Sequence, residues 1–209
     1  MSLTIVGLGN PGAEYDNTRH NAGRILLSMI AKRAKLEWKS DMKLNALTTT
    51  AEIDSTRQKS GRPLGGQAKI KFVLPETFMN NSGNAVAPLI KSQKDLDKLV
   101  VIYDDLDLGF GTMKISYNRG SGGHNGLASV AKRVKSEKFW RIRVGIAPVT
   151  PSGKIKKLPE SQKGTVYLMK VFSPKEQDEL KKMSKKIEQS LAVFSARGGA
   201  QAMGLVNTK

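Results

Sequence analysis

Residues 3–12 have the sequence Leu-Thr-Ile-Val-Gly-Leu-Gly-Asn-Pro-Gly. The nearly continuous apolar run at residues 3–8 is typical of a strand that is buried on both faces. Residues 9–12 then favour a turn, because glycine, asparagine and proline adopt the backbone angles that turns require. This segment therefore predicts a buried strand that ends in a polar loop.

Strand and helix patterns alternate along the rest of the chain. Apolar residues at helical spacing predict helices at residues 21–34, 80–91 and 127–135. A final helix begins with the capping box of Ser173, Pro174 and Glu176 and is closed by Gly198 and Gly199. Further strands are predicted at residues 46–53, 68–74, 99–103, 112–117, 141–147 and 165–172, with polar loops at 55–67 and 149–163. Since no linker or repeat divides the chain, we expect residues 1–209 to form a single α/β domain, with a mixed, largely parallel sheet flanked by helices on both faces.

Composition excludes several classes of protein. With 39% hydrophobic and 25% charged residues, the chain lies outside the ranges typical of disorder and of membrane bundles. The absence of cysteine excludes disulfides, thiolate metal sites and cysteine nucleophiles. Only His20 and His124 are available as imidazole ligands, so a histidine-based zinc site would need carboxylates to complete it, and metal catalysis is not expected. No apolar run approaches the roughly 18 residues of a membrane span, so no membrane partner is expected.

The charge indicates a polyanionic partner. Lys and Arg number 35 against 18 Asp and Glu, a formal net charge of +17. Residues 131–189 hold 16 basic and 6 acidic residues, so the carboxy-terminal third is the expected contact face. Nucleic acid is favoured over acidic lipid because basic side chains neutralise phosphates and release counterions. The alternative is that the charge serves solubility alone.

Polar side chains lie where predicted strands end. Asn10 follows the first strand, Asp104 follows residues 99–103, and Asn80 lies six residues beyond Leu74. Because ligands of open α/β sheets bind at the carboxyl ends of the strands, we expect these side chains to share a crevice. An asparagine amide can orient a water or a carbonyl, although each asparagine could equally serve as a turn or cap residue.

His20 is the candidate general base. It lies beside the start of the helix predicted at residues 21–34, where the helix dipole disfavours imidazolium and helps to keep the ring neutral. Asp104 is the candidate partner that would hold the other ring nitrogen and stabilise the charge formed during reaction. The alternative is a helix-capping histidine and an unrelated turn aspartate.

Residues 120–126, Gly-Ser-Gly-Gly-His-Asn-Gly, form a glycine-rich loop that opens a helix. Its backbone amides could hold a phosphate, but it matches neither a Walker A motif nor GxGxxG. A nucleotide-binding α/β enzyme is therefore a weaker alternative. Because the chain has no GxSxG elbow, serine-triad chemistry has no support either.

Five blocks of sequence follow one another in an order that is typical of one enzyme family. They are GLGNPG at residues 7–12 with Tyr15 and TRHNAG at 18–23, FMNNSG at 78–83, DDLDL at 104–108, GGHNGL at 122–127 and RIRVGI at 141–146. In these blocks the chain resembles bacterial-type peptidyl-tRNA hydrolases. The blocks span residues 7–146, most of the chain.

The resemblance implies hydrolysis of the ester that joins a peptide to the 3′-terminal ribose of tRNA, without metal or cofactor. It implies that His20 activates or aligns the attacking water and that Asp104 orients His20. Asn10, Asn80 and Asn125 would place the water, the ester and the peptide backbone. The remaining residues that it places beside the catalytic cleft are Tyr15 and Met79, with Gly122 and Gly123 in the cleft wall.

The resemblance also bears on RNA contacts. Lys114 and Arg143 match positions that the family uses for tRNA phosphates. The family often carries a second basic residue two places after that lysine, where this chain has Ser116, so recognition of the 5′ phosphate stays open. The loop at residues 55–67 and the basic segment 154–163 are candidates for additional RNA or ribosome contacts.

A catalytically inactive RNA-binding member of the same fold, similar to plant organellar splicing factors, is the alternative function. The intact set of His20, Asp104 and Asn10 favours the hydrolase. We expect a monomer. We also expect it to lie in the cytoplasm, because the first predicted strand begins almost at Met1 and leaves no room for a transit peptide. The mitochondrial matrix is the alternative location.

Overall fold

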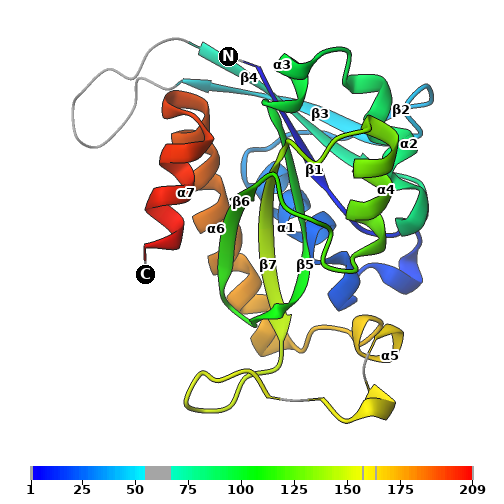
Figure 1. Cartoon of the computed structure of the whole chain (residues 1–209), viewed down its shortest axis with the longest axis vertical. Coiled ribbons are helices and arrows are strands. Elements are labelled where there is room, and N and C mark those ends of the chain that lie inside the picture. Colours follow the sequence, from blue (N-terminus) through cyan, green and yellow to red (C-terminus); the bar gives the residue numbers. More distant parts are fainter. Residues whose placement is uncertain (1, 55–66, 157, 163, 209) are drawn as a thin grey trace.

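The computed structural model describes residues 2–54, 67–156, 158–162 and 164–208. Within these residues, seven strands form one sheet in the order β2-β3-β4-β1-β5-β7-β6 (Figure 1). The strands are β1 (Leu3–Gly7), β2 (Lys39–Asp41), β3 (Ala46–Asp54), β4 (Gln67–Pro75), β5 (Leu99–Gly109), β6 (Met113–Tyr117) and β7 (Trp140–Ala147). The residues predicted as the first strand thus form the centre of the sheet.

The sheet is mixed, with a parallel centre. β1 pairs in parallel with β4 and β5, and β5 pairs in parallel with β7. The outer pairs β2–β3, β3–β4 and β6–β7 are antiparallel. The carboxyl ends of β1, β4, β5 and β7 therefore meet at one edge, where the loops after them can build a site.

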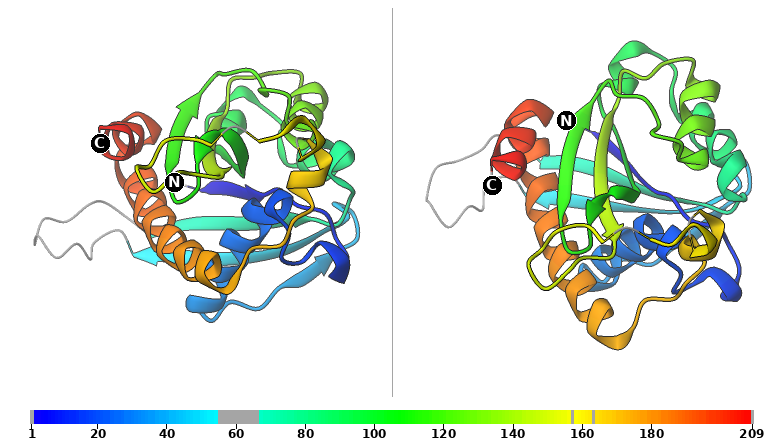
Figure 2. Two further views of the ribbon diagram at one scale, coloured as in Figure 1. Left: turned by 90° about the horizontal axis from the view of Figure 1, so that it is seen from below. Right: turned by 60° about the horizontal axis from the view of Figure 1, so that its bottom comes forward.

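Helices cover both faces of the sheet, as predicted (Figures 1 and 2). One face packs against α1 (Ala22–Arg33) and α6 (Pro174–Arg197), and the other against α2 (Ser82–Val86) and α4 (Asn125–Val134). Successive residues of the central strand alternate between the two cores, with Ile5 in the first and Val6 in the second. This double burial explains why residues 3–8 are apolar without alternation.

Several predicted elements are confirmed. The helix at residues 21–34 is α1, and residues 46–53 and 68–74 pair as antiparallel strands. The capping box of α6 is present: the Glu176 N–H donates to the Ser173 Oγ, and the Ser173 N–H donates to the Glu176 Oε2 at 2.8 Å. Residues 55–66 of the loop predicted between β3 and β4 lie outside the described residues.

The predictions for residues 80–91 and 165–172 were wrong. Residues 80–91 are not one helix but the short elements η3 (Met79–Asn81), α2 and η4 (Ala87–Leu89). Pro88 explains the break, because proline has no N–H to continue the helical hydrogen bonds. Residues 165–172 form α5 (Thr165–Leu168) and a single bridge, Thr18–Val171, in place of a strand. Tyr167 is the buried residue of this short helix, whereas the apolar Val166 and Val171 are exposed, so the apolar composition does not mark a buried strand.

A second carboxy-terminal helix, α7 (Gly199–Asn207), was not predicted. Gly198 ends α6 with φ of 85°, and the chain then re-enters a helix that packs against β6. A side chain at Gly199 would collide with the Trp140 ring, so glycine permits this close approach. The remaining short helical elements are α3 (Gln93–Leu96), η1 (Ala13–Tyr15), η2 (Arg19–Asn21) and η5 (Glu160–Gln162). No helix in the described part of the chain is long and apolar enough to cross a bilayer.

Candidate active site

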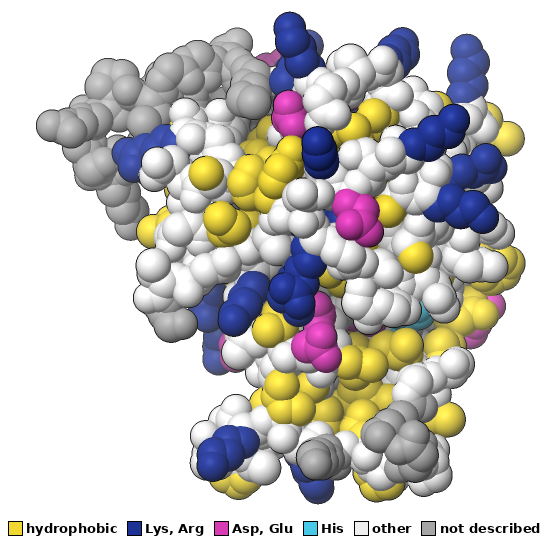
Figure 3. Space-filling model, viewed as in Figure 1, with side chains coloured by type: hydrophobic (Ala, Val, Ile, Leu, Met, Phe, Trp, Pro, Cys, Tyr) yellow, Lys and Arg dark blue, Asp and Glu magenta, His cyan; other side chains and the backbone are white. Residues whose placement is uncertain are grey.

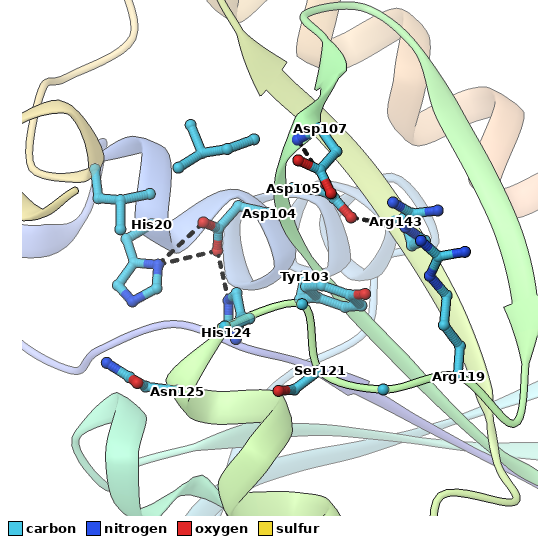
Figure 4. A pocket seen from close by; sticks show the side chains of 15 residues that line it. His20, Tyr103, Asp104, Asp105, Asp107, Arg119, Ser121, His124, Asn125 and Arg143 are labelled. Atoms are coloured by element: carbon cyan, nitrogen blue, oxygen red, sulfur yellow. Dashed lines mark hydrogen bonds and ion pairs between the residues drawn. The ribbon is translucent and has the colours of Figure 1, made fainter. Parts of the chain in front are cut away.

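A pocket lies at the edge where the parallel strands end. In the space-filling view, apolar side chains gather between the body of the molecule and its lower end, beside histidine surface (Figure 3). Figure 4 shows the pocket from close by. The residues that line it are His20, Tyr103, Asp104, Asp105, Leu106, Asp107, Arg119, Gly120, Ser121, Gly122, Gly123, His124, Asn125, Arg143 and Leu168.

His20 and Asp104 are in direct contact. The His20 Nδ1 lies 3.0 Å from the Asp104 Oδ1 and 3.1 Å from its Oδ2. Since a carboxylate only accepts, the Nδ1 carries the proton and the Nε2 is left as the basic nitrogen. His20 comes from η2, directly before α1. The expected partnership of these two residues is therefore present in the geometry.

Asp104 was predicted to follow the strand at residues 99–103. In the structure it lies within that strand. β5 continues to Gly109 because its pairing with β7 extends through Asp104 and Asp105. The Asp104 residue is only 3% exposed. A carboxylate on a paired strand is held more rigidly than one on a loop, which suits the task of orienting an imidazole.

His124 is a second imidazole on the same carboxylate. Its Nε2 lies 2.9 Å from the Asp104 Oδ1, and its Nδ1 accepts from the Leu127 N–H at 3.1 Å, which caps α4. The two rings are 5.0 Å apart between centroids. This contact was not predicted, because the sequence places His124 only in the glycine-rich loop. The sequence feature that could have indicated a structural role for His124 is its position at the amino-terminal cap of α4.

The charges on these groups depend on one another. Burial raises the pKa of Asp104, but the charge and hydrogen bond of His124 and then those of His20 outweigh it and lower the pKa to about 2. Burial lowers the pKa of His20, yet its hydrogen bond and charge interaction with Asp104 raise it above the usual 6.5. The expected effect of the helix dipole in keeping His20 neutral is therefore not the dominant one. The carboxylate favours the imidazolium that forms when His20 takes a proton.

A metal ion could bridge the spacing within the cluster of His20, Asp104 and His124, whose ligand atoms all lie within 4.8 Å of one another. The hydrogen bonds argue against that use. Coordination by the His124 Nε2 would put the ring proton on Nδ1, where it would face the Leu127 N–H. The donor set fits a hydrogen-bonded cluster better than a metal site.

Asn10 is fixed by its neighbours on the loop after β1. Its backbone N–H donates to the Asn21 Oδ1 at 2.8 Å, and its carbonyl accepts from the Asn21 Nδ2 at 2.9 Å. The Asn10 Oδ1 accepts from the Met79 N–H at 2.7 Å. No hydrogen bond joins the Asn10 Nδ2 to another described residue, and Asn10 is not among the residues that line the pocket. Asn21, fully buried, is a positioning residue that the sequence analysis did not identify.

The other residues expected beside the cleft are not all brought together. Asn125 lines the pocket together with Gly122 and Gly123 (Figure 4). Met79 is buried, whereas Asn80 is exposed beside it; neither lines the pocket. The half-buried Tyr15 contacts Phe78 edge-on, with 6.5 Å between centroids, also outside the pocket lining.

The two residues expected to contact phosphates are neighbours on adjacent strands. Lys114 of β6 pairs in register with Arg143 of β7. Lys114 is exposed, but Arg143 is only 7% exposed, and its Nε donates to the Asp105 Oδ2 at 2.7 Å. This ion pair, which was not predicted, offsets the Arg143 charge inside the protein.

The family model for peptidyl-tRNA hydrolase matches residues 4–209. The chain belongs to the peptidyl-tRNA hydrolase family. The peptidyl-tRNA hydrolase of Desulfitobacterium hafniense is 33% identical over 204 residues, covering 97% of this chain and 98% of that protein. That of Prochlorococcus marinus is 31% identical over 205 residues, covering 98% and 93%. The crystal structure of peptidyl-tRNA hydrolase from Acinetobacter baumannii superposes with a TM-score of 0.78 at 26% identity, covering 99% and 94%. The family resemblance stated from five sequence blocks is thus confirmed.

Proposed function

We propose that this chain hydrolyses the ester between peptide and tRNA in peptidyl-tRNA, with His20 as the general base and Asp104 as its orienting carboxylate. Family membership over nearly the whole chain supports the class of reaction. The observation that carries the assignment of residues is the bond of the His20 Nδ1 to Asp104, with the second ring nitrogen pointing away from the carboxylate (Figure 4).

The reaction proceeds in two steps. A water gives a proton to the His20 Nε2 as its oxygen attacks the ester carbonyl, and Asp104 stabilises the imidazolium. The tetrahedral intermediate then collapses, and the ribose oxygen leaves with the proton that His20 returns. The products are the free peptide acid and tRNA with a free ribose hydroxyl. General-base assistance contributes about 10²- to 10⁴-fold.

The asparagines supply neutral hydrogen-bond donors around the reacting ester. The Asn10 Nδ2 donates to the attacking water or the developing oxyanion, an interaction that typically contributes about 10²- to 10³-fold. Asn125 and Asn80 hold the peptide backbone, with Gly122 and Gly123 in the wall. Met79 and Tyr15 lie outside the pocket lining, and in this proposal they support the Asn10 side, where the Met79 N–H holds the Asn10 Oδ1.

The RNA contact is assigned chiefly to Lys114, because Arg143 already pairs with Asp105. A contact with about four phosphates predicts that log affinity falls with log salt at a slope of roughly −3. Lys114→Ala should weaken binding and reduce this slope. Lys94→Ala is the matched control, since Lys94 is also exposed but lies in α3, directly before the amino end of β5 and so at the opposite edge of the sheet. Salt-independent binding would contradict an electrostatic contact.

The decisive experiment measures release of free tRNA from a defined N-acetyl-aminoacyl-tRNA in the presence of EDTA. The wild-type chain should turn over, and His20→Ala should lose activity by about 10²- to 10⁴-fold while still binding tRNA. Tight RNA binding without turnover would favour the inactive RNA-binding alternative. Full activity of His20→Ala would overturn the role of His20.

A monomer that acts in the cytoplasm is part of the proposal, because peptidyl-tRNA is produced where ribosomes translate and the relatives are bacterial. Light scattering and fractionation test these two points.

A further inference from the structure

Arg19, the residue before His20, is enclosed between two aromatic rings. Its Cζ lies 4.8 Å from the Tyr167 ring centroid and 5.0 Å from that of Phe172. Its Nη2 donates to the Glu176 Oε1 at 2.8 Å, and the Arg19 side chain is 10% exposed. The planar guanidinium suits this stacked position in a way that a lysine ammonium would not.

The backbone around Arg19 joins the same partner segment. The Arg19 N–H donates to the Lys170 carbonyl at 3.0 Å, and the Phe172 N–H donates to the Asn17 carbonyl at 2.9 Å. Residues 167–172 therefore lie directly against the turn that carries His20. This turn, η2, is a three-residue 3₁₀ helix with little internal support, so its position depends on what it packs against.

The partner segment is itself anchored at two rigid elements. The Tyr167 hydroxyl donates to the Ile146 carbonyl of β7 at 2.8 Å. Glu176 belongs to the capping box of α6, where its Oε2 accepts from the Ser173 N–H. Through Arg19, the turn is thus connected to the sheet and to the longest helix of the described residues.

The contacts of Arg19 are not well suited to stabilising the fold alone. Among the described residues, the buried Nε and Nη1 of Arg19 have no hydrogen-bond partner. A buried arginine that is only partly satisfied gains little over an apolar side chain of similar volume. What an apolar side chain could not supply is a directional bond to Glu176.

We infer that Arg19 is a positioning residue for His20. Its guanidinium packs against the Tyr167 and Phe172 rings and bonds to Glu176, and these contacts set where η2 places the imidazole relative to Asp104. The inference rests on the proposed function, in which His20 is the base. The His20 to Asp104 contact of 3.0 Å leaves little tolerance. A misplacement of about 1 Å can cost about 10²-fold in rate.

The test compares two ion pairs that both join the amino-terminal part of the chain to α6. Arg19→Met keeps an unbranched side chain between the rings but removes the guanidinium, and Glu176→Gln weakens the bond. Glu188→Gln is the matched control, because Glu188 pairs with Arg33 of α1 on the exposed surface, and neither residue lines the pocket. We expect Arg19→Met to lower kcat about 100-fold and Glu176→Gln to lower it less, with KM within about threefold of wild type in both. Glu188→Gln should leave both constants unchanged.

Chemical rescue distinguishes positioning from general loss of structure. Arg19→Ala leaves a space between the two rings, so millimolar guanidinium should restore part of its kcat, whereas urea at the same concentration should not. Unchanged kcat in Arg19→Met, or a loss that Glu188→Gln reproduces, overturns the inference. So does a loss in Arg19→Ala that guanidinium leaves unaltered while the variant melts like the wild type.

The outcome also separates this inference from the proposed function. If the wild-type chain fails to release tRNA, the proposed function fails. The inference is then judged by NMR of the imidazoles, of which the chain has only two. Arg19→Met must shift the ring signals of His20, and Glu188→Gln must leave them in place; signals that stay unmoved in Arg19→Met overturn it.

Discussion

Replacing Asp104 with asparagine is predicted to disable His20 while preserving the shape of the site. Both imidazoles donate to this carboxylate, His20 to Oδ1 and Oδ2 and His124 to Oδ1. An asparagine oxygen at the Oδ1 position can still accept from both rings. Its NH₂ group then lies where Oδ2 was, 3.1 Å from the His20 Nδ1, and two donors face each other.

The conflict is relieved when the His20 proton moves to Nε2 and Nδ1 accepts from the amide. The ring can then no longer take a proton from water. A lost general base costs about 10²- to 10⁴-fold, and the corresponding aspartate-to-asparagine change in a serine protease triad costs about 10⁴-fold through the same tautomer error. We therefore expect kcat to fall about 10³- to 10⁴-fold, which raises the barrier by about 4–5 kcal/mol.

The acid limb of the pH profile supplies a second readout. Asp104 raises the pKa of His20, so the limb that reports deprotonation of the base should lie above the usual 6.5 in the wild type and move to lower pH in the variant. The His124 ring, with its centroid 5.0 Å from that of His20, also bonds to Asp104, so the variant changes both imidazoles and the shift of the limb reports the loss of the shared carboxylate. The assay is single-turnover release of tRNA from about pH 5 to 9. Asp97→Asn, which changes an exposed carboxylate outside the pocket, is the control. A kcat within tenfold of wild type, or an acid limb that stays in place, would refute the tautomer argument.

Three further predictions concern stability. Asn21→Ala removes two hydrogen bonds to the Asn10 backbone, so the free energy of unfolding in urea should fall by about 2–4 kcal/mol and kcat should fall with it; an unchanged midpoint contradicts this. Gly23→Ala places a methyl group against the Ile102 carbonyl where α1 crosses β5 and should cost about 1–3 kcal/mol, whereas Gly204→Ala, with open space around it, should be neutral or stabilising in the same thermal melts. The pKa of Asp104 is about 2 in the folded chain against 3.8 ordinarily, so its contribution of about 2 kcal/mol is present above pH 3.8 and is lost as pH falls through about 2. Urea titrations over this range should show that loss in the wild type and a flatter profile in Asp104→Asn.

Local patterns were sufficient for much of the fold. The apolar run at residues 3–8, the helical spacing of residues 21–34 and the capping box at Ser173 each depend on neighbours in sequence, and each predicts an element that the structure contains. Composition was a poorer guide at residues 165–172. There the inward Tyr167 and the surface Val166 belong to a short helix, because the segment is shaped by its contact with η2 and not by a neighbouring strand.

For the candidate site, too, the sequence identified some residues but not the contacts between them. Position at the end of predicted strands was enough to select Asp104 and Asn10 as candidates, and position beside a predicted helix start was enough to select His20; of these, His20 and Asp104 line the pocket. The chemistry of these residues could not be predicted, because it depends on contacts between residues far apart in the chain. His124 shares the Asp104 carboxylate, and Asn21 holds Asn10 in place. His20 and Asp104 are themselves separated by 84 positions. The direction of the His20 pKa shift depends on the same contact, because a buried carboxylate 3.0 Å away outweighs the lowering effect of burial. Such distances are set by how α1 packs across β5, and no local pattern of residues encodes them.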